Sequence, residues 1–234
     1  MRFSFVIPAL NEEKLIAGCI NSIKPQLRER DEIVVVDNGS KDATSIIAKK
    51  LGCRVVKEKE KGISPTRNRG AKEAKGDIIC FVDADGTLAK NWLYEARKSF
   101  NKKDVVVVDG LIVFSHKNPL KMFIYNIYTA AVYLGLVLSK LLLGKHFFTG
   151  NNMAINKKIF NKLGGFEPFI SEQMYLSKKF WNLRKGDGVF NPKMVIFQSS
   201  RGFDQAGYIR TILLWAVSLV RKKSSKYYNF ERKW

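Results

Sequence analysis

An alternation of short apolar runs with helical patterns fills the first half of the chain, and it constrains the fold more than any other feature. The runs that predict buried strands are residues 3–7, 33–36, 53–56 and 77–82. The helical patterns between them cover 12–23, a segment from a capping Asp42 to 51, and a segment that starts at Ser64-Pro65. Pro8 is expected to end the first strand. Repeated β-α units of this length predict an α/β fold, with a mostly parallel central sheet and helices on both faces.

The second half is more apolar and less regular. Its strand-like segments are 105–114, 147–155 and 189–197, and its helix-like segments are 171–183 and 208–220. Residues 122–143 form a long, strongly apolar stretch. We expect one domain over 1–204 that includes an apolar helix at 120–144, followed by an amphipathic helix and a basic tail at 205–234.

The apolar stretches raise the question of a membrane. Residues 122–139 approach the ~20 residues that span a bilayer, but a spanning helix would put Asp83 and Asn151 on opposite sides of it. If both residues build one site, this helix lies in the membrane interface, re-enters, or packs inside the protein. Residues 209–220 are too short to span and have the basic run 221–223 beside them, so they suit an interfacial helix on anionic lipid. A pair of core helices is the alternative.

The charge balance points to an anionic partner. The net charge is +20, from 41 Lys and Arg against 21 Asp and Glu, which favours nucleic acid, a phosphate-rich substrate or an anionic membrane surface. The three cysteines lack metal-ligand spacing, and neither His116 nor His146 lies near a Cys/His cluster. We therefore expect reduced thiols in a cytoplasmic protein and no zinc site. The amino-terminal apolar stretch is too short for a signal peptide.

Polar side chains follow the predicted strands at the points where the strands end. Asp83 and Asp85 come directly after the fourth strand, Glu12 follows the first, Asp37 follows the second, and Arg67 lies between the third and fourth. Loops after parallel strands gather along one sheet edge, where open α/β sheets bind ligands. Paired carboxylates there suit Mg²⁺ or Mn²⁺ with substrate phosphates, and arginine suits a pyrophosphate. Ordinary acidic turns and a solvated arginine are the alternatives.

Taken together, these segments resemble glycosyltransferase family 2. The matching motifs are Pro8-Ala9-Leu10-Asn11-Glu12, then Asp37-Asn38-Gly39-Ser40-Lys41-Asp42-Ala43-Thr44, Arg67-Asn68-Arg69-Gly70-Ala71, Asp83-Ala84-Asp85, and the segments 150–154 and 162–166. The similarity runs from residue 3 to residue 201. It implies the Rossmann-like GT-A fold, an inverting mechanism and a UDP- or GDP-sugar donor, and it makes 1–204 a catalytic domain.

The resemblance also implies residue roles. The residues implied to bind the nucleotide sugar are Pro8, Asn11, Glu12, Asp37, Arg67 and Asp83. The Mn²⁺ or Mg²⁺ ion would be held by Asp83 and Asp85, with Asp85 as the direct ligand. The implied catalytic residues are Asp85, Glu172 and Arg201, and those on the acceptor side are Gly150, Asn151, Gln173 and Gln198.

One position departs from the family pattern. Family members usually carry Glu-Asp where this chain has Glu172-Gln173, and the aspartate is the usual general base. Gln173 cannot accept a proton. Glu172 can serve instead, since a helix amino terminus favours its ionised form; the acceptor can be an already anionic lipid phosphate; or the chain has lost activity. The apolar helices and the basic tail favour the second explanation.

The expected partners are therefore a nucleotide-sugar donor, a lipid-linked or polyprenyl-phosphate acceptor, and an anionic membrane surface. The expected location is the cytoplasmic face of the cell membrane, as a peripheral or monotopic protein. Three rivals exist: a nucleotidyltransferase, a catalytically silent nucleotide-sugar-binding module, and a nucleic-acid-binding protein. The first should have a glycine-rich loop directly after strand one, and Pro8-Ala9-Leu10 is not that loop. We expect no nucleic-acid partner, because acidic residues at three strand ends would repel phosphate.

Overall fold

In the part of the chain that the structure describes, the fold is built on one sheet of eight strands in the order β3-β2-β1-β4-β7-β6-β8-β5. The computed structural model describes residues 1–168, 172–183, 186–201 and 204. The strands are β1 (Phe3–Ala9), β2 (Glu32–Asp37), β3 (Arg54–Lys57), β4 (Ile78–Val82), β5 (Gly86–Leu88), β6 (Val105–Ser115), β7 (Asn152–Asn156) and β8 (Asp187–Ser199). The helix expected at 208–220 and the tail at 205–234 lie outside the described residues.

The alternation in the first half of the sequence produces the parallel half of this sheet, as expected. Strand β1 pairs in parallel with both β2 and β4, and β2 pairs in parallel with β3. Beyond β4 the sheet is mixed. Strand β7 runs antiparallel to β4 and β6, β5 runs antiparallel to β8, and the long strands β6 and β8 are parallel. The carboxyl ends of β1, β2 and β4 therefore share one edge.

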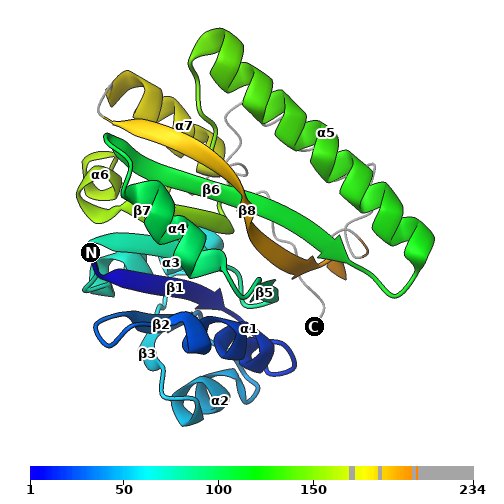
Figure 1. The fold of residues 1–234 in the computed structure, drawn as a ribbon. Helices are drawn as coiled ribbons and strands as arrows, with labels where there is room; N and C mark the ends of the chain where they lie inside the picture. The colour runs from blue at the N-terminus through cyan, green and yellow to red at the C-terminus, as the bar shows by residue number, and fades with distance from the viewer. Residues whose placement is uncertain (169–171, 184–185, 202–203, 205–234) are drawn as a thin grey trace.

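Helices cover both faces of the sheet (Figure 1). They are α1 (Ile16–Ile23), the short 3-10 helix η1 (Lys24–Gln26), α2 (Thr44–Lys50), α3 (Ile63–Glu73), α4 (Trp92–Phe100), α5 (Pro119–Leu143), α6 (Lys157–Lys162) and α7 (Glu172–Leu183). Helices α1, α2 and α4 pack on one face with Phe3, Phe5 and Ile7 of β1. Helices α3, α6 and α7 pack on the other face, to which Val6 points. Alternate residues of β1 thus supply two separate cores, because successive strand side chains point to opposite faces.

Several boundaries differ from the sequence expectation. Strand β1 continues through Pro8 to Ala9, because its pairing with β4 ends at Val6 and the missing N–H of Pro8 interrupts no ladder bond there. Helix α1 begins at Ile16 rather than Glu12, since residues 12–15 form a turn in which the Glu12 carbonyl accepts from the N–H groups of Leu15 and Ile16. The strand expected over 147–155 is restricted to β7. The sequence also did not indicate the short elements β5, α4 and α6.

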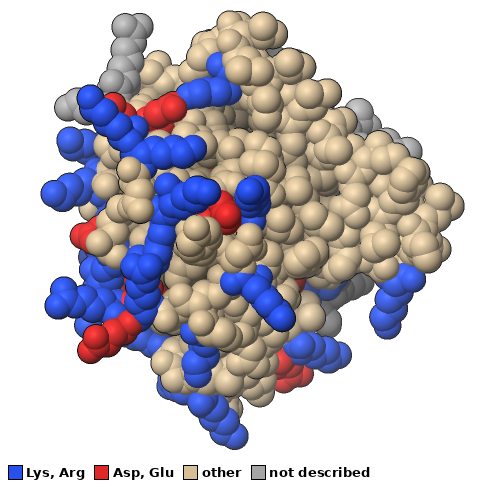
Figure 2. Space-filling model, viewed as in Figure 1, with Lys and Arg blue, Asp and Glu red and all other residues tan. Residues whose placement is uncertain are grey.

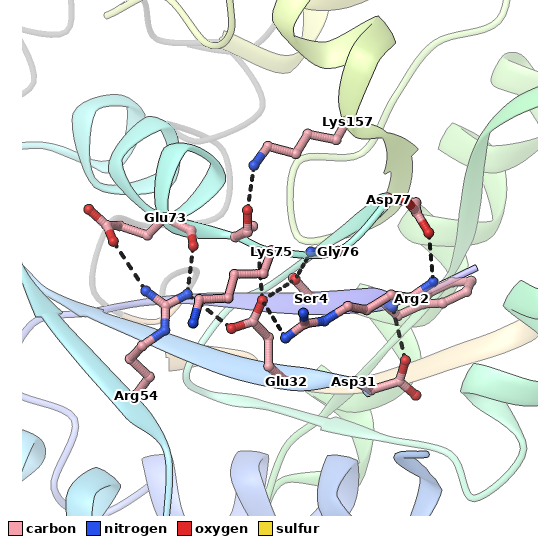
Figure 3. A network of polar contacts seen from close by, with 12 residues as sticks. Arg2, Ser4, Asp31, Glu32, Arg54, Glu73, Lys75, Gly76, Asp77 and Lys157 are labelled. Carbon is pink, nitrogen blue, oxygen red and sulfur yellow. Dashed lines mark hydrogen bonds and ion pairs between the residues drawn. The ribbon is translucent and has the colours of Figure 1, made fainter. Parts of the chain in front are cut away.

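A polar network ties the amino ends of the strands, at the edge opposite to the acidic loops (Figure 3). The Ser4 hydroxyl, fully buried, donates to Glu32 Oε1 at 2.7 Å and accepts from the Gly76 N–H at 2.8 Å. Arg54 bridges Glu32 and Glu73 at 2.9 and 3.1 Å. The network joins β1, β2, β3 and the segment that leads from α3 into β4, so it fixes the frame on which the loops at the other edge stand.

We expect Ser4→Ala to lower the free energy of unfolding by about 1–3 kcal/mol, because it leaves the buried Gly76 N–H without its acceptor. Urea denaturation measures the change. Thr87→Ala, at an exposed position of β5, is the control and should have little effect. An equal loss in both variants would show that the Ser4 hydroxyl has no special role.

Candidate active site

Asp83 and Asp85 lie in the turn between β4 and β5, and both face one amide group of β8. Gln198 Nε2 lies 3.5 Å from Asp83 Oδ2 and 3.3 Å from Asp85 Oδ1. The Asn151 side-chain amide donates to Gln198 Oε1 and so orients that amide. The register of β5 on β8 pairs Gly86 with Gln198, and a Cβ at Gly86 would lie 2.4 Å from Ile196. A side chain at position 86 would therefore require the buried Ile196 side chain to move, so glycine allows β5 to lie close to β8 here.

Arg67 of α3 joins this turn to the start of α7. Its side chain is buried, and it donates to Asp83 Oδ1 at 2.8 Å and to Glu172 Oε1 at 2.6 Å. Burial alone would lower the pKa of Arg67, but Asp83 and Glu172 raise it. Burial raises the pKa of Glu172, and Arg67 opposes that rise. Gly150 packs against the same guanidinium, since a Cβ there would lie 2.9 Å from Arg67 Nη1.

Arg201, just after β8, forms the second cationic link. Its Nη2 donates to Glu12 Oε1 at 2.6 Å and lies 3.8 Å from Asp85 Oδ2. Glu12 is buried after β1, and its backbone N–H donates to the Thr44 hydroxyl at 2.7 Å. The loops after β1 and β4 are thus connected through a residue that lies 189 positions from Glu12 in the sequence.

Asp37 and Asn11 shape the neighbouring loops. Asp37 accepts from the Ser40 N–H at 2.8 Å and from the Ser45 hydroxyl at 2.7 Å. Burial alone would raise the pKa of Asp37, but these hydrogen bonds lower it. Asn11 has a left-handed backbone with φ of 53°, and its N–H donates to the Ser40 hydroxyl. These bonds connect the loops after β1 and β2.

The structure therefore brings most of the expected site residues together. The cluster comprises Glu12, Arg67, Asp83, Asp85, Gly150, Asn151, Glu172, Gln198 and Arg201. Asp37 at the end of β2 and Asn11 in the loop after β1 stand beside the cluster, and Pro8 lies buried within β1. Gln173 follows Glu172 in α7, and its Cβ lies 3.6 Å from where a Cβ at Gly150 would be.

The donor set fits a divalent cation that a substrate helps to bind. In the cluster the carboxylates of Glu12, Asp83, Asp85 and Glu172 face two guanidiniums, which leaves two negative charges when all are ionised. Among the described residues, no three His, Cys, Asp or Glu side chains form a group that could hold a metal. Mg²⁺ and Mn²⁺ accept such sparse sites, taking one or two carboxylates and completing their shell with phosphate oxygens and water. Asp83 and Asp85 are the carboxylates that converge there.

Two supports of the site were not expected from the sequence. Asn38 is buried, and its side chain donates to the carbonyls of Glu58 and Glu60 and accepts from the Gly62 N–H. It thereby holds the loop that leads into α3.

The second support is Asp109 of β6, which binds His146 Nε2 at 2.7 Å and the Thr149 N–H at 2.8 Å. These contacts fix the segment before Gly150. Nothing in the sequence connects Asp109 with residues about 40 positions away, so no pattern could have found this contact.

The sequence of this chain is similar to those of known glycosyltransferases. The family model for Glycosyl transferase family 2 matches residues 4–164. The glycosyltransferase AglE of Haloferax volcanii is 29% identical over 123 residues, which make up 49% of this chain and 40% of that protein. This chain thus spans less than half the length of that relative.

Solved structures share the fold over almost the whole chain. A mannosyltransferase from Pyrobaculum calidifontis, in complex with GDP-Man and Mn²⁺, superimposes with a TM-score of 0.70 at 23% identity, over 95% of this chain and 65% of that one. A glucosyl-3-phosphoglycerate synthase from Mycobacterium tuberculosis, with Mn²⁺, UDP and phosphoglyceric acid, gives a TM-score of 0.65 at 22% identity, over 95% and 80%. At these identities the likeness establishes the fold.

Proposed function

Because this chain belongs to glycosyl transferase family 2, we propose that it is a nucleotide-sugar-dependent glycosyltransferase that moves a hexosyl group from a UDP- or GDP-sugar to an acceptor with inversion. One observation carries the proposal: loops from β1, β4 and β8 converge on Asp83 and Asp85, with two arginines between the carboxylates. In the reaction, an acceptor oxygen bonds to the anomeric carbon as the bond from that carbon to the diphosphate breaks.

Asp85, with Asp83 beside it, would hold a Mn²⁺ or Mg²⁺ ion. The bound ion supplies Lewis-acid neutralisation of the departing nucleoside diphosphate. Complexes of similarly folded proteins with GDP-Man and Mn²⁺, and with UDP and Mn²⁺, support this assignment. Because Asp83 is already bound to Arg67 at 2.8 Å, Asp85 is the better direct ligand.

The other residues bind and orient the donor. Glu12 and Asp37 would accept hydrogen bonds from the ribose and the nucleobase. Arg201 lies between Glu12 and Asp85, where a guanidinium can pair with a diphosphate or an acceptor phosphate. Arg67 keeps Asp83 in place and lends positive charge next to the pyrophosphate.

The acceptor we propose is a lipid-linked or polyprenyl phosphate. Such a nucleophile is already anionic and needs no general base, which agrees with Gln173 at the position where the family usually has aspartate. Glu172 is poorly suited to replace that base, since it is buried and bound to Arg67 at 2.6 Å. A silent binding module is the second candidate, and Gln173 is the observation that favours it.

A thermal-shift panel of UDP- and GDP-sugars, with and without Mn²⁺, tests the donor. A ligand that binds only the folded state raises its stability by RT ln(1 + [L]/Kd), so at equal ligand concentrations the true donor should give the largest shift and should need the ion. Transfer to a polyprenyl phosphate is then measured with that donor. No shift with any nucleotide sugar would reject the proposal, whereas a shift without turnover on any acceptor would favour the silent module.

We expect Gln173→Ala to change the rate of transfer to a phosphate acceptor by less than about threefold, because no proton has to be removed. Loss of a general base typically costs about 10²–10⁴-fold. Initial rates at saturating donor measure the effect. A collapse of the rate in Gln173→Ala would reject the idea that the acceptor needs no base.

A further inference from the structure

Helix α5 buries polar side chains and exposes apolar ones, which is the reverse of a surface helix in a water-soluble protein. Its buried residues are Tyr125, Thr129 and Tyr133, spaced four apart on one face. The Tyr133 hydroxyl donates to the Gly110 carbonyl at 2.7 Å and accepts from the Ile112 N–H. These hydroxyl-bearing residues therefore face the protein, and β6 is the strand on which the helix lies.

Further polar side chains of α5 also reach protein partners. The side-chain amide of Asn126 accepts from the Phe114 N–H and donates to the Phe114 carbonyl. Lys121 pairs with Asp204 at 3.0 Å, and Lys140 pairs with Asp187. These polar side chains of α5 thus bind partners on β6, at the start of β8 and shortly after β8.

The outer side of α5 is apolar and exposed to solvent. Leu134 is 60% exposed and Leu138 is 43% exposed. The other large apolar residues exposed along the helix are Leu120, Met122, Phe123, Ile124, Ile127, Val132, Leu141, Leu142 and Leu143. Figure 2 shows the region over α5 as a tan surface, with Lys and Arg gathered elsewhere and at its edges. Contiguous exposed apolar surface of this size marks an interaction site.

Length and composition make α5 the one helix in the described ranges that could cross a membrane, with 17% of its most apolar window buried. Its inner face nevertheless packs on β6, and both of its ends lead into strands of the same sheet. It cannot cross a bilayer while it keeps these contacts. A helix held this way can only lie along the bilayer surface, with its apolar side in the interface.

The charged residues around α5 indicate what binds its outer side. The sequence from Gly110 to Phe166 contains no Asp or Glu, and exposed Lys117 and Lys145 stand just before and just after the helix. A second copy of the chain would bring like charges together at the rim, whereas anionic lipid headgroups would neutralise them. The net charge of +20 likewise favours an anionic lipid surface over a second copy of the chain.

We infer that the outer face of α5 docks on an anionic lipid bilayer. The site lies next to the docked helix: Asp204 binds Lys121 and Tyr125 of α5 at 3.0 Å and the Ser200 hydroxyl at 3.4 Å, beside Arg201. A phosphate carried on a membrane lipid would thus arrive at the amino end of α5, close to Arg201 and Asp85. Docking itself does not depend on the proposed transfer reaction.

Flotation of the full chain with vesicles tests the inference, in the absence of donor, metal and acceptor. The vesicles are phosphatidylcholine with phosphatidylglycerol, or phosphatidylcholine alone. We expect binding to the mixed vesicles, weaker binding to the neutral ones, and a loss of at least about tenfold in Leu134→Gln/Leu138→Gln, because two exposed leucines no longer enter the interface.

The matched control is Ile46→Gln/Tyr94→Gln, which likewise replaces two exposed hydrophobic side chains with glutamine, at residues 57% and 65% exposed on α2 and α4. It should bind as the unchanged chain does. Two binding results would overturn the inference: the unchanged chain does not bind mixed vesicles, or the α5 variant binds them as well as the unchanged chain does. The inference would also be overturned if the unchanged chain and the control variant were dimers in solution and the α5 variant were a monomer. A failure of transfer with intact docking would count against the proposed function alone.

Discussion

Asp85→Ala is expected to lower kcat/KM for sugar transfer by about 10³-fold or more. Asp83 is bound to Arg67 at 2.8 Å, whereas Asp85 lies 3.8 Å from Arg201, so we assign Asp85 as the direct ligand of the cation. Without it, the charge that develops on the departing diphosphate would be neutralised by Arg67 and Arg201 alone. Steady-state transfer at saturating Mn²⁺ gives the ratio.

The same variant should lose the Mn²⁺-dependent part of the thermal shift caused by the nucleotide sugar. Asp77→Ala is the matched control, since Asp77 lies exposed just before β4 begins, on the opposite edge of the sheet. That control should retain both the rate and the shift. Retention of full activity in Asp85→Ala would remove the acidic pair from the mechanism and leave the family membership intact.

The sequence was sufficient to predict that the residues at the ends of the parallel strands lie close together. Glu12, Asp83 and Arg67 stand at or near the ends of β-α units, and the edge they share is a consequence of strand direction alone. The motif resemblance supplied their roles. Local patterns of apolar residues were sufficient for this part because the strands involved are buried on both faces.

The contacts made by β8 could not have been predicted in the same way. Gln198 meets Asp85 only because β8 pairs with both β5 and β6, and β5 has three residues, too few to leave a pattern. Arg201 reaches Glu12 for the same reason. These contacts depend on tertiary register rather than on local periodicity.

Helix α5 shows the same limit. Its apolar composition is plain in the sequence, but which side is buried depends on Tyr133 and Asn126 finding partners on β6. The sequence left the membrane interface, a re-entrant path and the protein interior as alternatives for this segment. Only the packing of the helix on β6 shows which of its sides is exposed.

Arg67→Met should lower the free energy of unfolding by about 3–5 kcal/mol at neutral pH, because it leaves buried Glu172 without its counter-charge. The melting temperature should fall by roughly 10 °C. Arg69→Met on the same helix is the matched control. Arg69 makes a partly exposed pair with Glu73, a class of contact worth about 1 kcal/mol at most.

The loss should depend on pH in a defined direction. Burial raises the pKa of Glu172 in the folded state, and Arg67 is the group that opposes the rise, so Arg67→Met should raise the pKa further. A carboxyl whose folded pKa exceeds its unfolded pKa destabilises the protein when it is ionised, and protonation relieves that penalty as the pH falls. The destabilisation should therefore be smaller at about pH 5 than at about pH 8, and Glu172→Gln added to Arg67→Met should recover part of it at the higher pH. A loss that grows toward acid pH would mean that Glu172 is not the carboxylate that Arg67 neutralises.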